Sequence, residues 1–360
     1  MGPDRFQNID HLPAGNQSLT GVNWPFLQKI EASRLRVWRK WLYWIGMALG
    51  AGFFFYQIFQ GVRSILQQKI IFGQPYWIVP AFLLAILVTR MQMMAWQMLM
   101  TGLQARLEWR DVPQGYVLSF IPRYIPGTVW GYITRGEWLN KSFAIPFGVT
   151  NLGSVLEMVF ILIANLTWIT SGYISTLWLK FAILIAPLFL AWVVWLITQW
   201  LAAKPVFLIA FGKEAEAAVR SFSLSRWLVI TMLMIIFWGL QGLSFQMVIW
   251  SFLPTGQPLA WSITEYWTAT SSYNLAWFIG FIVLFVPAGL GLRETFLSKL
   301  IQEKLKQPAG AASVISITFR LVLAFGELIW ALVALIINRW RVLPGSTPSN
   351  SSSVLTTPKK

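Results

Sequence analysis

The chain reads F-I-P-R-Y-I-P-G-T-V-W-G-Y-I-T-R-G-E-W-L from Phe120 to Leu139, where Pro-Gly interrupts an apolar run and charge follows the break. A second stretch, Phe285–Phe296, reads F-V-P-A-G-L-G-L-R-E-T-F and repeats that order. In a bilayer every backbone N–H and C=O needs an internal partner, so a broken helix persists only inside a bundle or beside a wet cavity. Ionisable groups at membrane depth are costly and are typical of functional sites. Both stretches therefore predict the working region of a membrane protein.

The composition predicts an all-α, polytopic membrane protein. The 360 residues are 56% hydrophobic and only 11% charged, with a mean hydropathy of +0.60. Apolar runs of about 20 residues, the length that crosses a bilayer core, recur along the chain. We expect six full spans at roughly 41–61, 76–100, 145–170, 177–202, 227–252 and 311–338, with two irregular, Pro-Gly-broken segments at 113–140 and 261–300.

Basic residues set the expected topology and domain limits. Residues 1–40 are read as a cytoplasmic tail with a basic interfacial helix, 41–340 as the transmembrane domain, and 341–360 as a disordered tail. Residues 203–226 contain Lys204, Lys213, Arg220 and Arg226, and Arg339 and Arg341 follow the last span, which predicts that both termini are cytoplasmic in a cell (inner) membrane protein. The broken segments would then be re-entrant from opposite faces, with a possible inverted repeat. A full span at 265–287 is the alternative.

Several function classes are disfavoured by residue usage. The chain has no cysteine, and its one histidine, His11, lies in the polar N-terminal tail, so we expect no metal, no cofactor and no catalytic triad. The net charge of +15 clusters beside apolar segments, which suits anionic lipid headgroups better than nucleic acid. Whether the chain is an enzyme stays open, and the residue usage favours a non-enzyme.

Charged residues inside the apolar segments are the candidate binding groups. The acids are Glu157, Glu265, Glu294 and Glu327, and the arginines are Arg90, Arg123, Arg135, Arg293 and Arg320. Such groups must pair with one another, and buried ion pairs can be purely structural. The surplus of arginine suggests a phosphate site, because a guanidinium presents a planar fork of donors. The Pro-Gly breaks can be simple helix kinks instead.

Two motifs carry a resemblance to a known family. The early motif is Tyr124-Ile125-Pro126-Gly127-Thr128-Val129-Trp130-Gly131 with Arg135, and the late motif is Pro287-Ala288-Gly289-Leu290-Gly291-Leu292-Arg293-Glu294. Together they resemble the flippase-like transmembrane domain of lysylphosphatidylglycerol synthetases and a related family of uncharacterised integral membrane proteins. Glu157, opening one span, and Arg320, opening the last, fall where that family has similar residues. Thr128 and Ala288 depart from its pattern.

The resemblance implies lipid translocation. The family's aminoacyl-transferase activity is not carried over, because the chain ends soon after its last span. We expect a lipid translocator that moves a polar-headgroup phospholipid or glycolipid through a charged midplane cavity. The alternatives are a membrane glycosyl or phosphoryl transferase acting on a lipid-linked substrate, or a structural partner of another membrane enzyme. A homo-oligomer is possible. The candidate substrate-binding residues are Arg123, Pro126, Gly127, Trp130, Arg135, Glu157, Gly289, Gly291, Arg293, Glu294 and Arg320.

Overall fold

The computed structural model describes residues 72–119, 130–256, 262–283 and 291–342, together with a few isolated positions between 55 and 66. These ranges belong to one compact unit of the chain, residues 46–360. The predictions for the N-terminal tail and the C-terminal tail beyond Val342 lie outside the described residues, as does nearly all of the span expected at 41–61.

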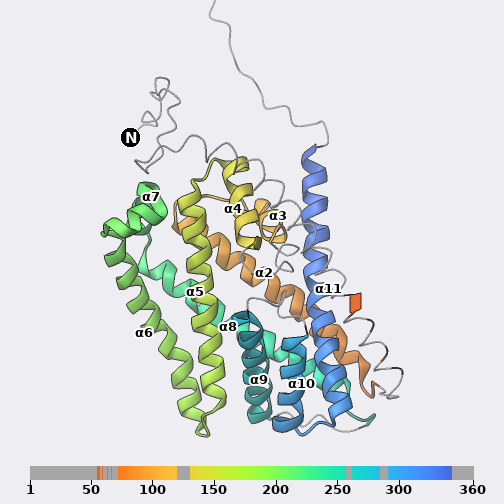
Figure 1. The fold of residues 1–360 in the computed structure, drawn as a ribbon. Helices are drawn as coiled ribbons and strands as arrows, with labels where there is room; N and C mark the ends of the chain where they lie inside the picture. The colour runs from red at the N-terminus through yellow and green to blue at the C-terminus, as the bar shows by residue number, and fades with distance from the viewer. Residues whose placement is uncertain are drawn as a thin grey trace, which may run out of the picture. The chain divides into compact units, whose positions relative to one another are not determined.

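The described residues form helices and turns and contain no strand (Figure 1). The elements are η1 (Pro75–Trp77), α2 (Ile78–Gly102), α3 (Asp111–Val117), α4 (Trp130–Phe143), α5 (Phe147–Gly172), α6 (Leu177–Ala202), α7 (Pro205–Arg220), α8 (Leu224–Ser251), α9 (Ile263–Ile282), α10 (Leu292–Lys304) and α11 (Ala309–Val342). The all-α class predicted from composition is confirmed for this part of the chain.

Five segments are long and apolar enough to cross a membrane: Pro75–Gly102, Phe147–Gly172, Leu177–Ala202, Leu224–Ser251 and Ala309–Arg339. They coincide with five of the six spans expected from hydropathy. Within the most apolar window, 61% of the residues of α5 and of α8 are buried, against 17% for α6 and for α11. The centre of the bundle is therefore built on α5 and α8, while α6 and α11 present broad apolar faces outward.

Small and polar residues allow the central helices to pack closely. A Cβ built on Gly242 of α8 would lie 2.2 Å from the hydroxyl oxygen of Thr270 on α9, and one on Gly172 would lie 2.2 Å from Ser271. The side-chain amide of Asn165 on α5 donates to Asn274 of α9 at 2.7 Å. Apolar side chains gain little by leaving lipid for a helix interface, so close backbone approach and buried hydrogen bonds hold such helices together.

The segment expected to be irregular at 261–300 is mostly regular helix. The helices α9 and α10 pack against each other, and residues 261 and 284–290 of this segment lie outside the described residues. The indole of Trp267 near the start of α9 donates to the hydroxyl of Ser171 at 3.1 Å, and Lys304 at the end of α10 lies 4.2 Å from the ring centre of Tyr173. Both outer ends of this hairpin therefore meet the α5–α6 connection, which we call the α5–α6 end.

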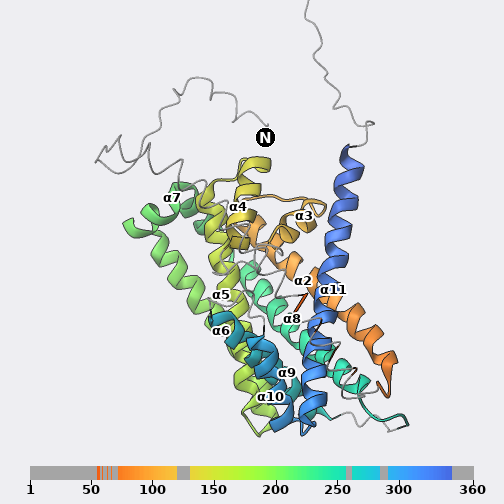
Figure 2. The same cartoon turned by 45° about the vertical axis from the view of Figure 1, so that its right-hand side comes forward.

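A second, shorter helix pair lies toward the opposite end. A Cβ on Gly131 in the first turn of α4 would lie 2.7 Å from the carbonyl oxygen of Ser119, so the inner ends of α3 and α4 are adjacent. At the start of α5, which follows α4, a Cβ on Gly148 would overlap the carbonyl of Phe211 in α7. Figures 1 and 2 show α3 and α4 at the same end of the bundle as α7, with α9 and α10 toward the α5–α6 end. We call the first region the α7 end.

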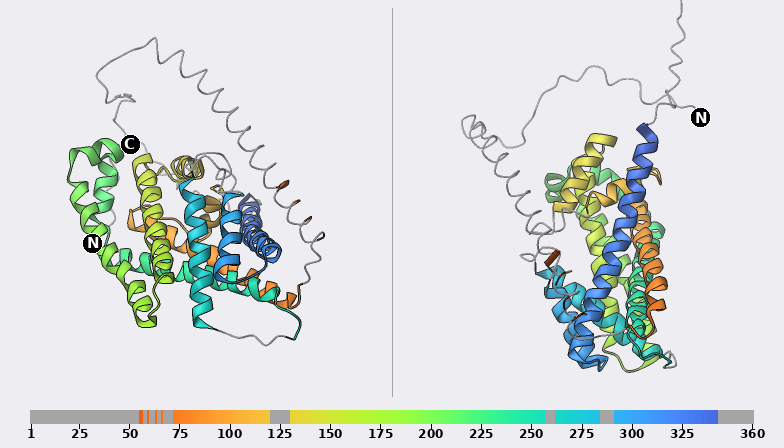
Figure 3. Two further views of the ribbon diagram at one scale, coloured as in Figure 1. Left: turned by 60° about the horizontal axis from the view of Figure 1, so that its bottom comes forward. Right: turned by 90° about the vertical axis from the view of Figure 1, so that its right-hand side faces the viewer.

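The packing pattern occurs twice in chain order. A long helix, a folded-back pair and a second long helix make up α2–α3–α4–α5, and the same series recurs in α8–α9–α10–α11. Corresponding contacts also recur: α2 packs on α11 as α8 packs on α5, and α3 packs on α11 as α9 packs on α5. Two other views show α11 running from the α9–α10 pair to the α3–α4 pair (Figure 3). The inner ends of α3 and α4 and those of α9 and α10 thus line one region of the bundle.

Candidate functional site

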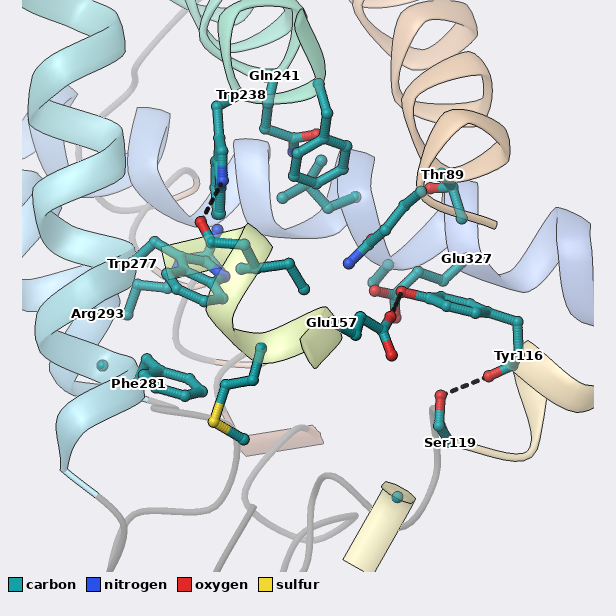
Figure 4. Close-up of a pocket in the computed structure, with 18 of the residues that line it drawn as sticks. Thr89, Tyr116, Ser119, Glu157, Trp238, Gln241, Trp277, Phe281, Arg293 and Glu327 are labelled. Carbon is teal, nitrogen blue, oxygen red and sulfur yellow. Dashed lines mark hydrogen bonds between the residues drawn. The ribbon is translucent and has the colours of Figure 1, made fainter. Parts of the chain in front are cut away.

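A cavity of about 210 Å³ lies between the inner ends of the α3–α4 and α9–α10 pairs. Its lining comes from α2, α3, α4, α5, α8, α9, α10 and α11, so both series of helices contribute (Figure 4). Arg135, Glu157, Arg293, Arg320 and Glu327 all line it. The sequence analysis expected arginines and carboxylates from the two broken segments to share one chamber, and the described residues Arg135 and Arg293 do so.

Arg135 and Glu157 form the most buried ion pair among the described residues. Nη2 of Arg135 donates to Oε2 of Glu157, and the two side chains are 2% and 6% exposed. The hydroxyl of Tyr116 donates to the second carboxylate oxygen at 3.3 Å. The guanidinium also lies over the rings of Trp96 and Tyr116, at 4.7 and 5.5 Å from their centres. This arrangement compensates both charges, because a desolvated cation gains from aromatic faces as well as from its carboxylate.

The charge of Arg293 is compensated in a different way from that of Arg135. Its Nη2 donates to the hydroxyl of Tyr273, its guanidinium lies 4.9 Å from the centre of the same ring, and the residue is 8% exposed. Gln241 donates to that hydroxyl as well, at 3.4 Å. Among the described residues Arg293 forms no ion pair with a carboxylate. Its positive charge therefore lies at the cavity beside a hydroxyl group and an aromatic ring, with no described carboxylate in ion-pair contact.

Glu294, the next residue, has other partners. One carboxylate oxygen accepts from the backbone N–H of Gly291 at 2.7 Å and thereby caps the start of α10. The other lies 3.7 Å from Nε of Arg320 on α11. Gly291 has a φ of 81°, a left-handed conformation that residues with a Cβ rarely adopt. The glycine of the late motif is thus needed to start α10 at this angle and to bring Glu294 back onto its own helix terminus.

Aromatic side chains form the wall beside Arg293. Trp238 and Trp277 meet edge to face with ring centres 4.8 Å apart, and Trp277 stacks on Phe281 at 5.2 Å. The indole of Trp238 donates to the carbonyl of Ile161 at 3.0 Å, which fixes α8 to α5. Figure 4 shows Trp277, Phe281 and Arg293 grouped on one side of the cavity. The wall is rigid because each ring is held by another ring or by a hydrogen bond.

The predicted site residues divide into two groups. Arg135, Glu157, Gly291, Arg293, Glu294 and Arg320 gather at the cavity or directly behind it. Arg123, Pro126, Gly127 and Gly289 lie outside the described residues, as does the side chain of Trp130, which begins α4. No structural role is assigned to this second group.

Three details differ from the sequence-based expectations. Glu157 does not open a span, since α5 begins ten residues earlier, and Arg320 likewise lies well inside α11. Glu265 is exposed in the first turn of α9, where Ser262 caps the helix by accepting from its N–H.

Some lining residues were not among the predicted substrate-binding residues, although Glu327 had been named among the charged groups inside the apolar segments. Tyr116, Gln241 and Tyr273 provide the hydroxyl and amide groups of the site, and Glu327 adds a second carboxylate to its wall. The spacing of Arg320 and Glu327, seven residues apart in a predicted span, is a signal that would have placed both on one helix face. For the two tyrosines no signal in the sequence distinguishes them from the other interfacial aromatics.

Comparison with protein-family models, with curated proteins and with solved structures finds no match to this chain. The site is therefore interpreted from its own geometry.

Proposed function

We propose that this protein is a translocator of polar lipids and that Arg293 is the main contact of the headgroup phosphate. The supporting observation is the buried guanidinium of Arg293, which faces the cavity without an ion pair to any described carboxylate. Removing such a charge from water costs several kcal/mol unless an anion compensates it. The cation–π contact with the ring of Tyr273 offsets roughly 2 kcal/mol of this cost when it is desolvated, and it supplies no negative charge. A phosphate supplies that charge and matches the planar fork of arginine.

The other charged residues position this site. In the arrangement described, Arg135 is held by Glu157, and Arg320 lies beside Glu294. These contacts tie α4 to α5 and α10 to α11, so they hold each shorter helix against a long one. Arg320, whose side chain is 15% exposed, is placed to assist Arg293. The side chain of Arg135 is only 2% exposed, so Arg135 is not placed to assist Arg293.

The proposal includes a bilayer arrangement. The six spans expected from hydropathy would cross the inner membrane, with α3–α4 re-entrant from the cytoplasmic face and α9–α10 from the outer face. The α7 end carries Lys204, Lys213 and Arg220, and by the positive-inside rule this charge favours a cytoplasmic location for that end and for both termini. Lys304 would then lie outside, against that trend, with its ammonium group over Tyr173.

The twofold packing pattern supports a transport role. Transporters built from inverted repeats bind their substrates at the interface between the repeats, often at interrupted helices. Here Arg135 lies over Tyr116 in the first series, and Arg293 lies over Tyr273 in the second, so corresponding helices bring similar groups to one cavity. The apolar outer faces of α6 and α11 would let acyl chains remain in lipid while the headgroup enters.

The test is lipid movement in reconstituted vesicles. The purified protein is placed in vesicles that contain a tail-labelled phospholipid, and the fraction of label that reaches the other leaflet is followed over time. Arg293→Ala and Glu294→Ala should abolish movement, because the first removes the phosphate contact and the second removes the cap that orients α10. Arg220→Ala is the matched control, since that arginine is exposed on α7, away from the cavity lining, and forms an ion pair with Glu216. Wild-type rates in both site variants would refute the proposal.

Protein abundance separates transport from a structural role. If the charged cavity only stabilises the bundle for another enzyme, Arg293→Ala will lower the amount of folded protein without changing the rate per folded molecule. We expect the opposite result, a normal yield with a lost rate, because Arg293 is the one buried cation of the site that is not tied to a described carboxylate.

A further inference from the structure

Arg90 is a charged residue of the apolar segments that does not line the cavity. It belongs to the candidate span Pro75–Gly102 and lies at least twelve residues, or about 18 Å, from either end of that span. Thr89, the residue before it, does line the cavity. Because an α-helix has 3.6 residues per turn, the two side chains leave α2 on different faces. Arg90 therefore needs an explanation of its own.

The outward face of α2 around Arg90 is apolar. Leu83, Leu87 and Met94 are exposed, and together with Arg90 they follow one another at spacings of three or four residues, so they form one stripe along the helix. Arg90 itself is partly exposed, while its Nη1 is fully buried and has no hydrogen bond. The side chain is therefore held against the bundle, at a point where the surrounding surface is made for lipid.

Arg90 has no carboxylate partner among the described residues, where it takes part in no ion pair. The five candidate spans contain two acids, Glu157 and Glu327, and both line the cavity. In the ranges that the structure does not describe, the acids of the sequence are those of the N-terminal tail, at positions 4, 10 and 31. A second copy of the chain meets the same limit, because the acids of its spans line a cavity as well.

A phospholipid supplies what this surface lacks. Its phosphate carries a negative charge and matches the planar fork of donors on a guanidinium. Its acyl chains match the apolar stripe on either side of Arg90. An uncompensated arginine in the apolar core of a bilayer is costly, so a phosphate that reaches it there is held more firmly than one in water.

We propose that Arg90 binds the phosphate of a bilayer phospholipid on the outward face of α2, deeper than the headgroup layer. This binding site is separate from the cavity and does not depend on the proposed function.

The experiment measures how closely lipid phosphorus approaches this face. The chain has no cysteine, so Leu87→Cys carries a single nitroxide label about one turn from Arg90. Phe189→Cys is the matched control, because Phe189 is exposed on α6 and both positions lie twelve residues from the nearer end of their candidate spans. The labelled proteins are placed in nanodiscs of phosphatidylglycerol, and the phosphorus relaxation of the lipid is measured.

We expect the label at Leu87 to enhance phosphorus relaxation at least about twofold more than the label at Phe189. The enhancement falls with the sixth power of distance, and Leu87 lies about 5 Å along the helix axis from Arg90 but about 18 Å from the nearer end of its span. Arg90→Gln should remove the difference, whereas Arg106→Gln, which changes an exposed arginine outside the spans, should keep it. Equal relaxation from both labels, or a difference that survives Arg90→Gln, would overturn the inference.

Two further arms identify the source of the signal. Arg293→Ala should leave the difference unchanged, and if it abolishes the difference, the lipid is bound in the cavity and the inference fails. Inorganic phosphate added to the same samples gives its own resonance. If that resonance depends on Arg90 and the lipid resonance does not, the ligand is free phosphate and the assignment to a lipid fails.

The result does not depend on transport or on one variant. If Arg90→Gln does not fold, the comparison of the two labels and the Arg293→Ala arm still decide. Lipid movement is not measured in these samples, so a failed transport test would end the proposed function and leave the binding site standing.

Discussion

Removing the charge of Glu157 should destabilise the protein far more than removing any surface charge. In Glu157→Gln the guanidinium of Arg135 stays where it is, 2% exposed, with the rings of Trp96 and Tyr116 but no anion. Breaking a buried pair by removing one partner typically costs about 3–5 kcal/mol, because the remaining charge is left uncompensated. We expect a loss of this size in the free energy of unfolding.

A double-mutant cycle tests the reason for that loss. Arg135→Met alone leaves the carboxylate of Glu157 buried with only the Tyr116 hydroxyl, so it should also be costly. The double variant Arg135→Met/Glu157→Gln removes both charges, and replacing a whole buried pair is often nearly neutral. We therefore expect the double variant to lie within about 2 kcal/mol of wild type, well short of the sum of the single losses.

The assay is equilibrium unfolding in mixed micelles, followed by far-ultraviolet circular dichroism. The matched control is Glu216→Gln, which breaks the exposed Arg220–Glu216 pair of α7 and should cost only about 0.3–0.5 kcal/mol. The reasoning would be refuted if Glu157→Gln cost less than about 1 kcal/mol, or if the losses of the two single variants simply added.

Three further predictions concern packing and backbone geometry. Gly242→Ala should lower the free energy of unfolding by about 1–3 kcal/mol. Gly326→Ala should be tolerated, because its new methyl group would meet its nearest neighbour at 3.4 Å. Thermal unfolding of both variants in detergent compares the two. Gly291→Ala should cost about 1–2 kcal/mol through its φ of 81°, and an unchanged melting temperature would contradict this. Trp238→Phe should cost about 1–3 kcal/mol by leaving the carbonyl of Ile161 without its indole donor, and hydrogen exchange should report faster opening where α5 meets α8.

The membrane-spanning helices could be predicted from the sequence because hydropathy and length are local properties. The expected span at 177–202 matches Leu177–Ala202 residue for residue, and 145–170 is shifted by two residues from Phe147–Gly172. The segment after residue 261 was harder to assign. Its Thr, Ser and Asn residues look like an interruption, yet in the structure they are the buried face of the regular helix α9, where Thr270 and Asn274 are fully buried.

The pairing of the charges could not be predicted in the same way. Adjacent Arg293 and Glu294 look like partners in the sequence, but α10 points them to Tyr273 and to Arg320. The partner of Arg135 is Glu157, which lies 22 residues later in the chain. A turn separates the two, and hydropathy does not predict how that turn orients α4 against α5. Which side chains meet depends on how helices cross, and crossing is decided by close contacts such as that of Gly242 with Thr270. Composition reveals that pairs must exist without showing which ones.

The polar face of α9 also has a consequence for the order of biosynthesis. Ser272 and Asn274 need partners as soon as the helix leaves the ribosome and enters lipid, and their neighbours α5 and α8 have by then been made. The pair α3–α4 emerges earlier, and its neighbour α11 is translated last. A nascent chain that stops before Ala309 would thus contain α9 together with its neighbours α5 and α8, while α3 would still lack its neighbour α11. The final helix closes the early half of the molecule as well as the late one.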